Sequence, residues 1–340
     1  MTPVKAWLLT FLSGFFVIFA LLILTVTTPI PYGDLTRIGL ISDSEFGWTR
    51  EPPHVPPELL RAVPVAQADV LVIGDSFSMT HRWQSVLAKG GYRVTTVSWG
   101  QFNESLCDDF DDWLARSGFK GRLVIIESVE RILNTRVAQM RSCKQMKKPL
   151  ESRIEPSATP AENVPGFALN WGAKITSGWY IARNTRRAKA TPADTTSGYM
   201  TKARSVVNGC EMFSHRLCTK ALFLGEDDSN GELTAGDVAT MQAFTKAQSA
   251  IPILWMVIPN KTTTYIDIDH SGAFVEALGA SGLGPDLFSF AQEKKTQIRD
   301  FYFPNDTHLS MHGQLALGER MLAEVRKIVP EPIGSIAMKP

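Results

Sequence analysis

The sequence lacks an excess of charge of either sign. Its 340 residues include 35 Lys and Arg against 34 Asp and Glu, which leaves a net charge of +1. A chain so close to neutral gives no general reason to expect a nucleic-acid partner. Two local basic runs, Arg183-Asn-Thr-Arg186-Arg187 and Lys147-Lys148, are expected to be solvated surface.

Metal-ligand spacings are also missing. No Cys-x-x-Cys pair is present and no His lies at ligand spacing beside a cysteine, so we expect no metal and no cofactor. The four cysteines suit an oxidising compartment and permit two disulfides, with three possible pairings. The pairing to test first joins Cys107 with Cys143 and Cys210 with Cys218, and unpaired buried thiols are the alternative.

Charged residues are also absent between Ala6 and Thr28, where Leu, Phe, Ile and Val are frequent. About 20 such residues span a bilayer as a helix. The run ends without an Ala-x-Ala-like cleavage site, so residues 1–28 are predicted to be a retained anchor and not a signal peptide. Lys5 and the amino terminus place the short side in the cytoplasm. We expect a single-pass protein of the inner (cytoplasmic) membrane, with the remaining chain in the periplasm or outside.

The rest of the chain divides by composition. Residues 29–68, rich in Pro and Gly, are predicted to form an extended tether. From Asp69 the pattern alternates as in α/β proteins, so residues 69–335 are expected to form one domain with a mostly parallel sheet. Strands are predicted at 70–74, 92–98, 123–127, 251–258 and 287–290, and helices at 77–89, 104–117, 129–140, 235–249, 272–279 and 311–329. Residues 141–232 interrupt the rhythm and are interpreted as an insertion whose aromatic residues need burial.

The stretch from Val70 to Ser78 organises the domain. Its apolar residues predict a buried strand, which turns through Gly74 and Asp75 to Ser76. Such a turn places Ser76 at the carboxyl edge of the sheet, where open α/β sheets bind ligands, and at the N-terminus of the predicted helix. The position predicts a nucleophile. A phosphatase with Asp75 as its nucleophile is disfavoured, because no second Asp follows two residues later.

A base for this nucleophile is available near the end of the chain. Asp306 precedes His308 by two residues in the loop before the last predicted helix. At this spacing a carboxylate can hold Nδ1–H of the imidazole and leave Nε2 free to take the hydroxyl proton. We therefore predict a catalytic triad of Ser76, His308 and Asp306.

Together the motifs resemble the SGNH/GDSL hydrolase superfamily, whose first block is matched by Gly74-Asp75-Ser76-Phe77 and last block by Asp306-Thr307-His308. Within it, the chain is similar to the alginate acetyltransferase (AlgX-like) group, which O-acetylates extracytoplasmic polysaccharides. The closer likeness rests on Pro259-Asn260-Lys261-Thr-Thr-Thr-Tyr265 and on Asp306-Thr307-His308-Leu309-Ser310 with Gly313. It implies a three-layer α/β/α, flavodoxin-like fold, an acetyl-serine intermediate, a polysaccharide acceptor and a membrane-bound acyltransferase as acetyl donor.

The departures from that group concern the order of the blocks and the oxyanion hole. The Ser block precedes the Asp-His block, whereas the alginate enzymes have the permuted order, and Leu309 replaces the usual Trp. The Gly-x-Asn-Asp block is missing. Gly100 and Asn103 are the candidate replacements, because the N–H groups of Gly100 and Ser76 could hold the oxyanion.

The remaining candidates have two interpretations each. Lys261 and Tyr265 bind substrate or brace their loop, and Arg131 contacts a polyanionic substrate or pairs with Glu127. Three functions stay open: acetyl transfer to a polysaccharide, ester hydrolysis by the same triad, and a non-catalytic carbohydrate-binding or assembly subunit. Water and a sugar hydroxyl attack the same acyl-enzyme, so sequence does not separate the first two.

Overall fold

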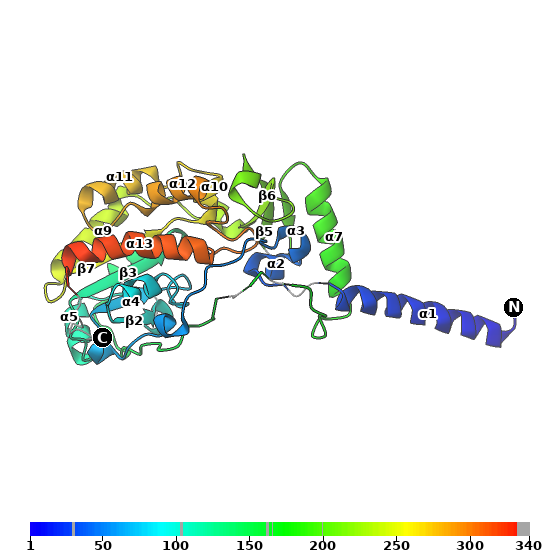
Figure 1. The fold of residues 1–340 in the computed structure, drawn as a ribbon, viewed down its shortest axis with the longest axis horizontal. Helices are drawn as coiled ribbons and strands as arrows, with labels where there is room; N and C mark the ends of the chain where they lie inside the picture. The colour runs from blue at the N-terminus through cyan, green and yellow to red at the C-terminus, as the bar shows by residue number, and fades with distance from the viewer. Residues whose placement is uncertain (29–30, 103–104, 161–162, 165, 199, 332–340) are drawn as a thin grey trace, which may run out of the picture. The chain divides into compact units, whose positions relative to one another are not determined.

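The computed structural model describes residues 1–331 except 29–30, 103–104, 161–162, 165 and 199 (Figure 1). The chain forms two compact units. Unit 1 comprises Met1–Glu51, Asn163–Asp228 and Tyr302–Thr307, and unit 2 comprises Pro52–Glu162, Ser229–Phe301 and His308–Pro340. Each unit is therefore assembled from segments that lie far apart in the sequence.

Unit 2 is built on a parallel sheet of strand order β2-β1-β3-β7. Its strands are β1 (Val70–Gly74), β2 (Val94–Ser98), β3 (Leu123–Val129) and β7 (Ile253–Ile258). Because Gly74 pairs with Ser98 and Val129 pairs with Ile258, the carboxyl ends of the strands share one edge of the sheet. The nearly continuous burial of these strands is typical of a parallel sheet covered on both faces.

Helices cover both faces of this sheet. Alternate strand residues such as Leu71, Ile73 and Val124 pack in one apolar core with side chains from the helices between β2 and β7. On the other face, Gln84 of the first helix after β1 bonds Thr96 of β2, and this helix packs against the last helix of the chain. The helices of unit 2 are α4 (Gln84–Lys89), α5 (Phe110–Arg116), α6 (Glu130–Met140), α9 (Ala235–Ala247), α10 (Lys261–Tyr265), α11 (Gly272–Ser281), α12 (Leu287–Gln297) and α13 (Met311–Ile328).

Unit 1 contains a small antiparallel sheet and the N-terminal helix. The sheet has the order β4-β5-β6, with strands β4 (Thr195–Ser197), β5 (Thr201–Ser205) and β6 (Lys220–Leu224). Its helices are α1 (Pro3–Val26), α2 (Asp34–Gly39), α3 (Asp43–Phe46), α7 (Ser177–Ala190) and α8 (Gly209–Met212). In the described part of the chain, α1 is the one helix long and apolar enough to cross a membrane.

The two disulfides have the pairing that the sequence analysis put first. Cys107 bonds Cys143 within unit 2, and Cys210 bonds Cys218 within unit 1. Together with the apolar α1, two disulfides fit an extracytoplasmic domain. The α/β class, the parallel sheet and the disulfides are confirmed.

Several local predictions were wrong. Residues 287–290 begin helix α12 and not a strand, because the Asp286 side chain accepts hydrogen bonds from the N–H groups of Phe288 and Ser289 and so caps a helix. In the segment expected to be an extended tether, α2 and α3 form, since Leu35 and Phe46 are buried in the core of unit 1. The expected insertion is divided, because residues 141–162 belong to unit 2 and 163–228 to unit 1.

Candidate active site

Ser76 lies two residues after the end of β1, at the carboxyl edge of the parallel sheet, and is exposed. The strand order reverses between β1 and β3, and ligands of open α/β sheets bind at such a switch point. Gly74 is needed for the tight exit from the strand. A Cβ atom there would lie 2.5 Å from Ser78 Cβ and 2.6 Å from Glu127 Oε2.

The residue brought to Ser76 is His308. Its Nε2 lies 2.8 Å from Ser76 Oγ, a hydrogen bond between two residues of unit 2. The His308 ring also packs on the buried Phe77, with 4.7 Å between ring centroids. In the tautomer protonated on Nδ1, Nε2 accepts the Ser76 hydroxyl proton, which is the arrangement that activates a serine.

The position of His308 is fixed by the start of α13. Ser310 caps this helix, since its Oγ accepts the N–H of Gly313, and its own N–H donates to the carbonyl of Phe301. A Cβ on Gly313 would lie 2.1 Å from that carbonyl oxygen. The Ser-x-x-Gly pattern after His308 therefore holds the loop in place and needs no catalytic role.

The predicted helix N-terminus at Ser76 is not present. Regular helix α4 begins at Gln84, eight residues after Ser76, and the intervening residues form turns. Asp75 Oδ1 accepts the N–H of Phe77, and the Asp75 carbonyl accepts the N–H groups of Ser78 and Met79, so a single turn and not a continuing helix follows Ser76. A helix dipole therefore does not act on Ser76, and a developing oxyanion would depend on individual N–H groups.

Asp306 belongs to unit 1, whose last segment ends at Thr307, the residue before His308. Its Oδ2 accepts the backbone N–H of Asp34 at 2.9 Å. Asp34 in turn accepts hydrogen bonds from the N–H and the hydroxyl of Thr307. The first turn of α2 therefore braces the segment that leads to His308. Orientation of the imidazole by Asp306 stays a prediction.

Beneath Ser76, Asp75 is held by Arg136. Arg136 Nη1 donates to Asp75 Oδ2 at 3.1 Å and to Ser128 Oγ at 2.7 Å, and its guanidinium lies 4.5 Å from the ring centroid of Trp99. Asp75 Oδ2 also accepts the N–H of Val129 at 2.9 Å. One carboxylate therefore links the Ser76 turn to the end of β3 and to α6, as expected for a structural residue.

Glu127 lies fully buried under the same turn. Its Oε2 accepts the hydroxyl of Ser78 at 2.7 Å and the N–H of Asp75 at 2.9 Å. Its Oε1 is buried, and no described residue gives it a hydrogen bond. Burial raises the pKa of Glu127 well above its usual value, and the nearby Asp75 carboxylate adds to that rise. Glu127 is therefore neutral over a wider pH range than an exposed glutamate.

A cavity of about 440 Å³ opens beside Ser76. One side comes from the ends of β1 and β2, with Trp99 as its aromatic wall, and the other from α6. Its lining residues are Asp75, Ser76, Ser98, Trp99, Ile132, Thr135, Arg136 and Gln139. Trp99 itself is only 1% exposed, so the cavity presents mainly the exposed hydroxyl and amide groups of Ser76, Thr135 and Gln139, which suit a polar organic ligand.

The other predicted site residues are not among the described residues that line this cavity. Gly100 is exposed just after β2, where its N–H donates to Ser98 Oγ at 3.3 Å, and Asn103 lies outside the described residues. Arg131 bonds the Asn260 side chain through its backbone N–H and its guanidinium. Lys261 and Tyr265 are buried in α10, 1% and 8% exposed, an arrangement that fits their interpretation as loop braces.

Two residues of the site, Arg136 and Trp99, were not singled out from the sequence, and neither was Asp34 of unit 1, which bonds Asp306. A signal for Arg136 existed, because it shares a helix face with the apolar Leu133, Val137 and Met140, and an arginine on a buried face needs a carboxylate partner. No comparable signal marks Asp34, which lies 272 residues before its partner Asp306.

The fold and site define an α/β protein with a serine–histidine pair at the carboxyl edge of a parallel sheet. No protein-family model, no curated protein and no solved structure matches the chain. The chemistry of this pair therefore has to be inferred from its own geometry.

Proposed function

We propose that this protein is an SGNH-type O-acetyltransferase that acts on an extracytoplasmic polysaccharide through an acetyl-Ser76 intermediate. The observation that carries the proposal is the 2.8 Å hydrogen bond between Ser76 Oγ and His308 Nε2. A serine hydroxyl is a weak nucleophile by itself and gains reactivity from a base at this distance. The exposure of Ser76 gives an acyl donor access to it.

In the first half of the reaction, Ser76 Oγ attacks the carbonyl carbon of an acetyl donor and its proton passes to His308 Nε2. The tetrahedral intermediate collapses when the bond to the donor breaks, and His308 returns the proton to the leaving oxygen. Asp306 orients the imidazole in this scheme. The N–H of Ser76 holds the oxyanion, and the N–H of Gly100 joins it by exchanging its bond to Ser98 Oγ for the oxyanion.

In the second half, a sugar hydroxyl attacks the acetyl-Ser76 ester. His308 takes the proton of that hydroxyl and then gives it to Ser76 Oγ as the ester bond breaks, which leaves an acetylated sugar and the original enzyme. The cavity beside Ser76 offers the exposed Thr135 and Gln139 to the acceptor. The apolar α1 and the two disulfides support a place at the outer side of the inner membrane, where a membrane-bound acyltransferase can deliver the acetyl group.

Ester hydrolysis by the same residues is the second candidate. It is favoured by the open position of Ser76, because water reaches an exposed acyl-serine as readily as a sugar does. The two functions share every step as far as the acyl-enzyme and differ only in the final acceptor.

The deciding experiment incubates the full chain in detergent with p-nitrophenyl acetate, with and without acceptor oligosaccharides. Mass spectrometry of the intact protein reports acetylation of Ser76, and analysis of the sugars reports transfer. Acetylated sugar that disappears in Ser76→Ala supports the transferase, and free acetate alone supports the esterase. No acetyl-enzyme in the parent chain would falsify both. Ser117→Ala, a partly exposed serine after α5, is the control and should behave as the parent chain.

A further inference from the structure

Several large apolar side chains of unit 1 are exposed to solvent outside α1. The sequence predicted burial for the aromatic residues of this region, yet Trp171 is 76% exposed, Trp179 55% and Tyr180 44%. Phe167, Leu169 and Ile175 in the same segment are also exposed. A cluster of exposed aromatic and aliphatic side chains marks an interaction surface.

This segment is attached to the C-terminal end of α1. Thr25 of α1 donates its hydroxyl proton to the carbonyl of Ile175 at 2.6 Å and accepts the N–H of Gly178. A Cβ on Gly178 would lie 2.7 Å from the backbone of Leu24 and Thr25, so the two segments touch at the backbone level. The exposed aromatic residues therefore flank the point where a membrane-crossing α1 would leave the bilayer.

Helix α7 runs across the end of α1 and not alongside it (Figure 1). A helix that crosses the end of a membrane-spanning helix lies close to the plane of the membrane surface. One face of α7 is buried against unit 1 through Gly178, Ile181, Thr185 and Ala188. The opposite face, which carries Trp179 and three arginines, is exposed. This is the two-faced pattern of helices that lie in a bilayer interface.

All charged side chains in the segment that includes α7 are positive. Residues 167–190 contain five basic residues and no Asp or Glu. Lys189 pairs with Glu45 at 2.9 Å. The exposed guanidinium groups of Arg183, Arg186 and Arg187 make no hydrogen bond or ion pair with any residue that the structure describes. The charge of these three arginines is therefore available to an external anion.

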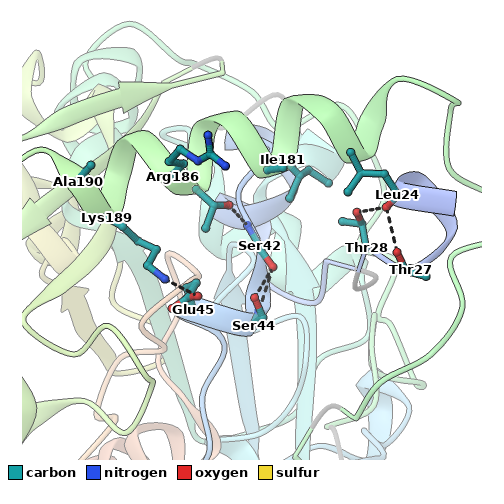
Figure 2. A pocket seen from close by; sticks show the side chains of 12 residues that line it. Leu24, Thr27, Thr28, Ser42, Ser44, Glu45, Ile181, Arg186, Lys189 and Ala190 are labelled. Carbon is teal, nitrogen blue, oxygen red and sulfur yellow. Dashed lines mark hydrogen bonds and ion pairs between the residues drawn. The ribbon is translucent and has the colours of Figure 1, made fainter. Parts of the chain in front are cut away.

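The inner side of α7 is fixed in place. Figure 2 shows α7 above α3 and the end of α1, with Lys189 reaching Glu45. Thr185 Oγ1 accepts the N–H of Ser42 at 2.9 Å. A cavity of about 580 Å³ lies between these elements and opens beside Thr27 and Thr28, with Arg186 in its wall. The contacts of Thr185 with Ser42 and of Lys189 with Glu45 therefore hold the inner face of α7 against α3.

Helix α1 has no interfacial anchors of its own at this end. Its last turn carries no basic residue, and no Lys or Arg occurs between Val26 and Arg37. Membrane-spanning helices are commonly flanked at the interface by Trp, Tyr and basic side chains. Here a segment about 150 residues later in the sequence provides them.

We propose that Trp171, Trp179, Tyr180, Arg183, Arg186 and Arg187 form a membrane-docking surface that binds the anionic phospholipid headgroups around α1. The aromatic rings sit at headgroup level, and the arginines pair with headgroup phosphates. Each basic residue near an anionic leaflet strengthens such binding about fivefold, so three together hold α7 on the surface. The surface belongs to unit 1, whereas Ser76 belongs to unit 2, and the inference does not depend on the proposed acyl transfer.

The test uses the full chain in nanodiscs of phosphatidylcholine, with and without phosphatidylglycerol, and follows amide hydrogen exchange of residues 167–190. We expect several-fold slower exchange in the anionic discs than in the neutral discs, and loss of this protection at high salt. Arg183→Gln, Arg186→Gln and Arg187→Gln, combined in one chain, should remove the difference between the two lipids. The variant with Lys147→Gln and Lys148→Gln, an exposed basic pair in unit 2, should keep it.

A second measurement tests the aromatic residues in a Trp7→Phe background, which removes the tryptophan of α1. Lipids brominated near the headgroup should quench part of the tryptophan fluorescence, and Trp171→Phe with Trp179→Phe should abolish most of that quenching. Equal exchange in both lipids, or quenching unchanged by the two substitutions, overturns the proposal. Protection that appears only after another protein is added also overturns it and assigns the surface to a protein partner.

Discussion

Arg136 and Asp75 form a buried ion pair directly under the turn that presents Ser76, with side chains 2% and 10% exposed. Removal of one member of such a pair leaves an uncompensated charge in the interior. We predict that Arg136→Met lowers the free energy of unfolding by about 3–5 kcal/mol. Urea titration of the full chain in nanodiscs, followed by tryptophan fluorescence, measures the change.

The control for this prediction is an exposed pair of the same unit. Lys144 Nζ and Asp108 Oδ2 are 2.8 Å apart, but both side chains are more than half exposed. Such pairs contribute little in water. Lys144→Met should leave the unfolding midpoint unchanged. If both variants lose the same free energy of unfolding, the buried Arg136–Asp75 pair stabilises the fold no more than an exposed pair does.

Glu127 gives a prediction about pH. Its pKa is raised well above the usual value in the folded state, first by burial and then by Asp75. The folded chain therefore holds a proton that the unfolded chain releases as the pH rises above the ordinary glutamate pKa. This contribution to stability is complete below that ordinary pKa and is lost as the pH rises through the raised folded pKa.

Glu127→Gln removes this titration and keeps the side-chain shape. We predict a flatter fall in Tm with rising pH for Glu127→Gln than for the parent chain, with the largest relative gain at the alkaline end. Differential scanning calorimetry of the full chain in detergent, over a series of buffers, measures both profiles. Glu151→Gln, an exposed control in the same unit, should follow the parent profile. Parallel profiles for Glu127→Gln and the parent would refute the prediction.

Much of this site was within reach of the sequence because its signals are local. Val70–Gly74 is a short apolar run closed by glycine, and the helix Met311–Ile328 has a long amphipathic pattern, so both elements were predicted within a residue or two. Their ends carry Ser76 and His308. In a parallel sheet such ends meet at one edge, so the sequence also indicated that the two side chains would lie close together.

What escaped prediction depends on contacts between distant segments. Asp34 lies in a Pro-rich stretch, and only its fold into α2 brings it to Asp306. The short apolar run at residues 287–290 predicted a strand. The segment forms a helix because the Asp286 side chain accepts hydrogen bonds from its first N–H groups. The aromatic residues around Trp171 were expected to be buried, since sequence alone does not separate a core aromatic from an interfacial one.

The close packing at Gly74 predicts a steric effect. A methyl group there would overlap Ser78 Cβ and Glu127 Oε2. Neither atom can move away easily, because the first is attached to the backbone and the second is held by hydrogen bonds. We expect Gly74→Ala to cost roughly 1–3 kcal/mol of stability and to displace the Ser76 turn. In the exposed part of α11, a Cβ on Gly279 meets nothing within 4 Å, so Gly279→Ala should stabilise the chain by up to about 1 kcal/mol. The two variants should therefore shift the urea midpoint in opposite directions, and a stable Gly74→Ala chain would contradict this packing.

The serine–histidine pair predicts a large rate effect from one substitution. His308→Gln removes the base but keeps a polar side chain, so we expect acylation of Ser76 by p-nitrophenyl acetate to slow by about 10²- to 10⁴-fold. Stopped-flow release of p-nitrophenol measures the rate, and circular dichroism checks the fold. His54→Gln, an exposed histidine of the same unit, should acylate at the parent rate. Unchanged acylation in His308→Gln would remove His308 from the mechanism.

The cavity beside Ser76 makes a prediction that separates acceptor binding from acylation. Gln139 lines this cavity from α6, whereas the base on Ser76 is His308. Gln139→Ala should therefore raise the KM for the acceptor oligosaccharide several-fold and leave acetylation of Ser76 by p-nitrophenyl acetate unchanged. Gln292→Ala, on α12, lies outside the cavity lining and should change neither quantity. If Gln139→Ala slows acetylation and leaves KM alone, the cavity belongs to the acyl donor and the sugar approaches Ser76 from another side.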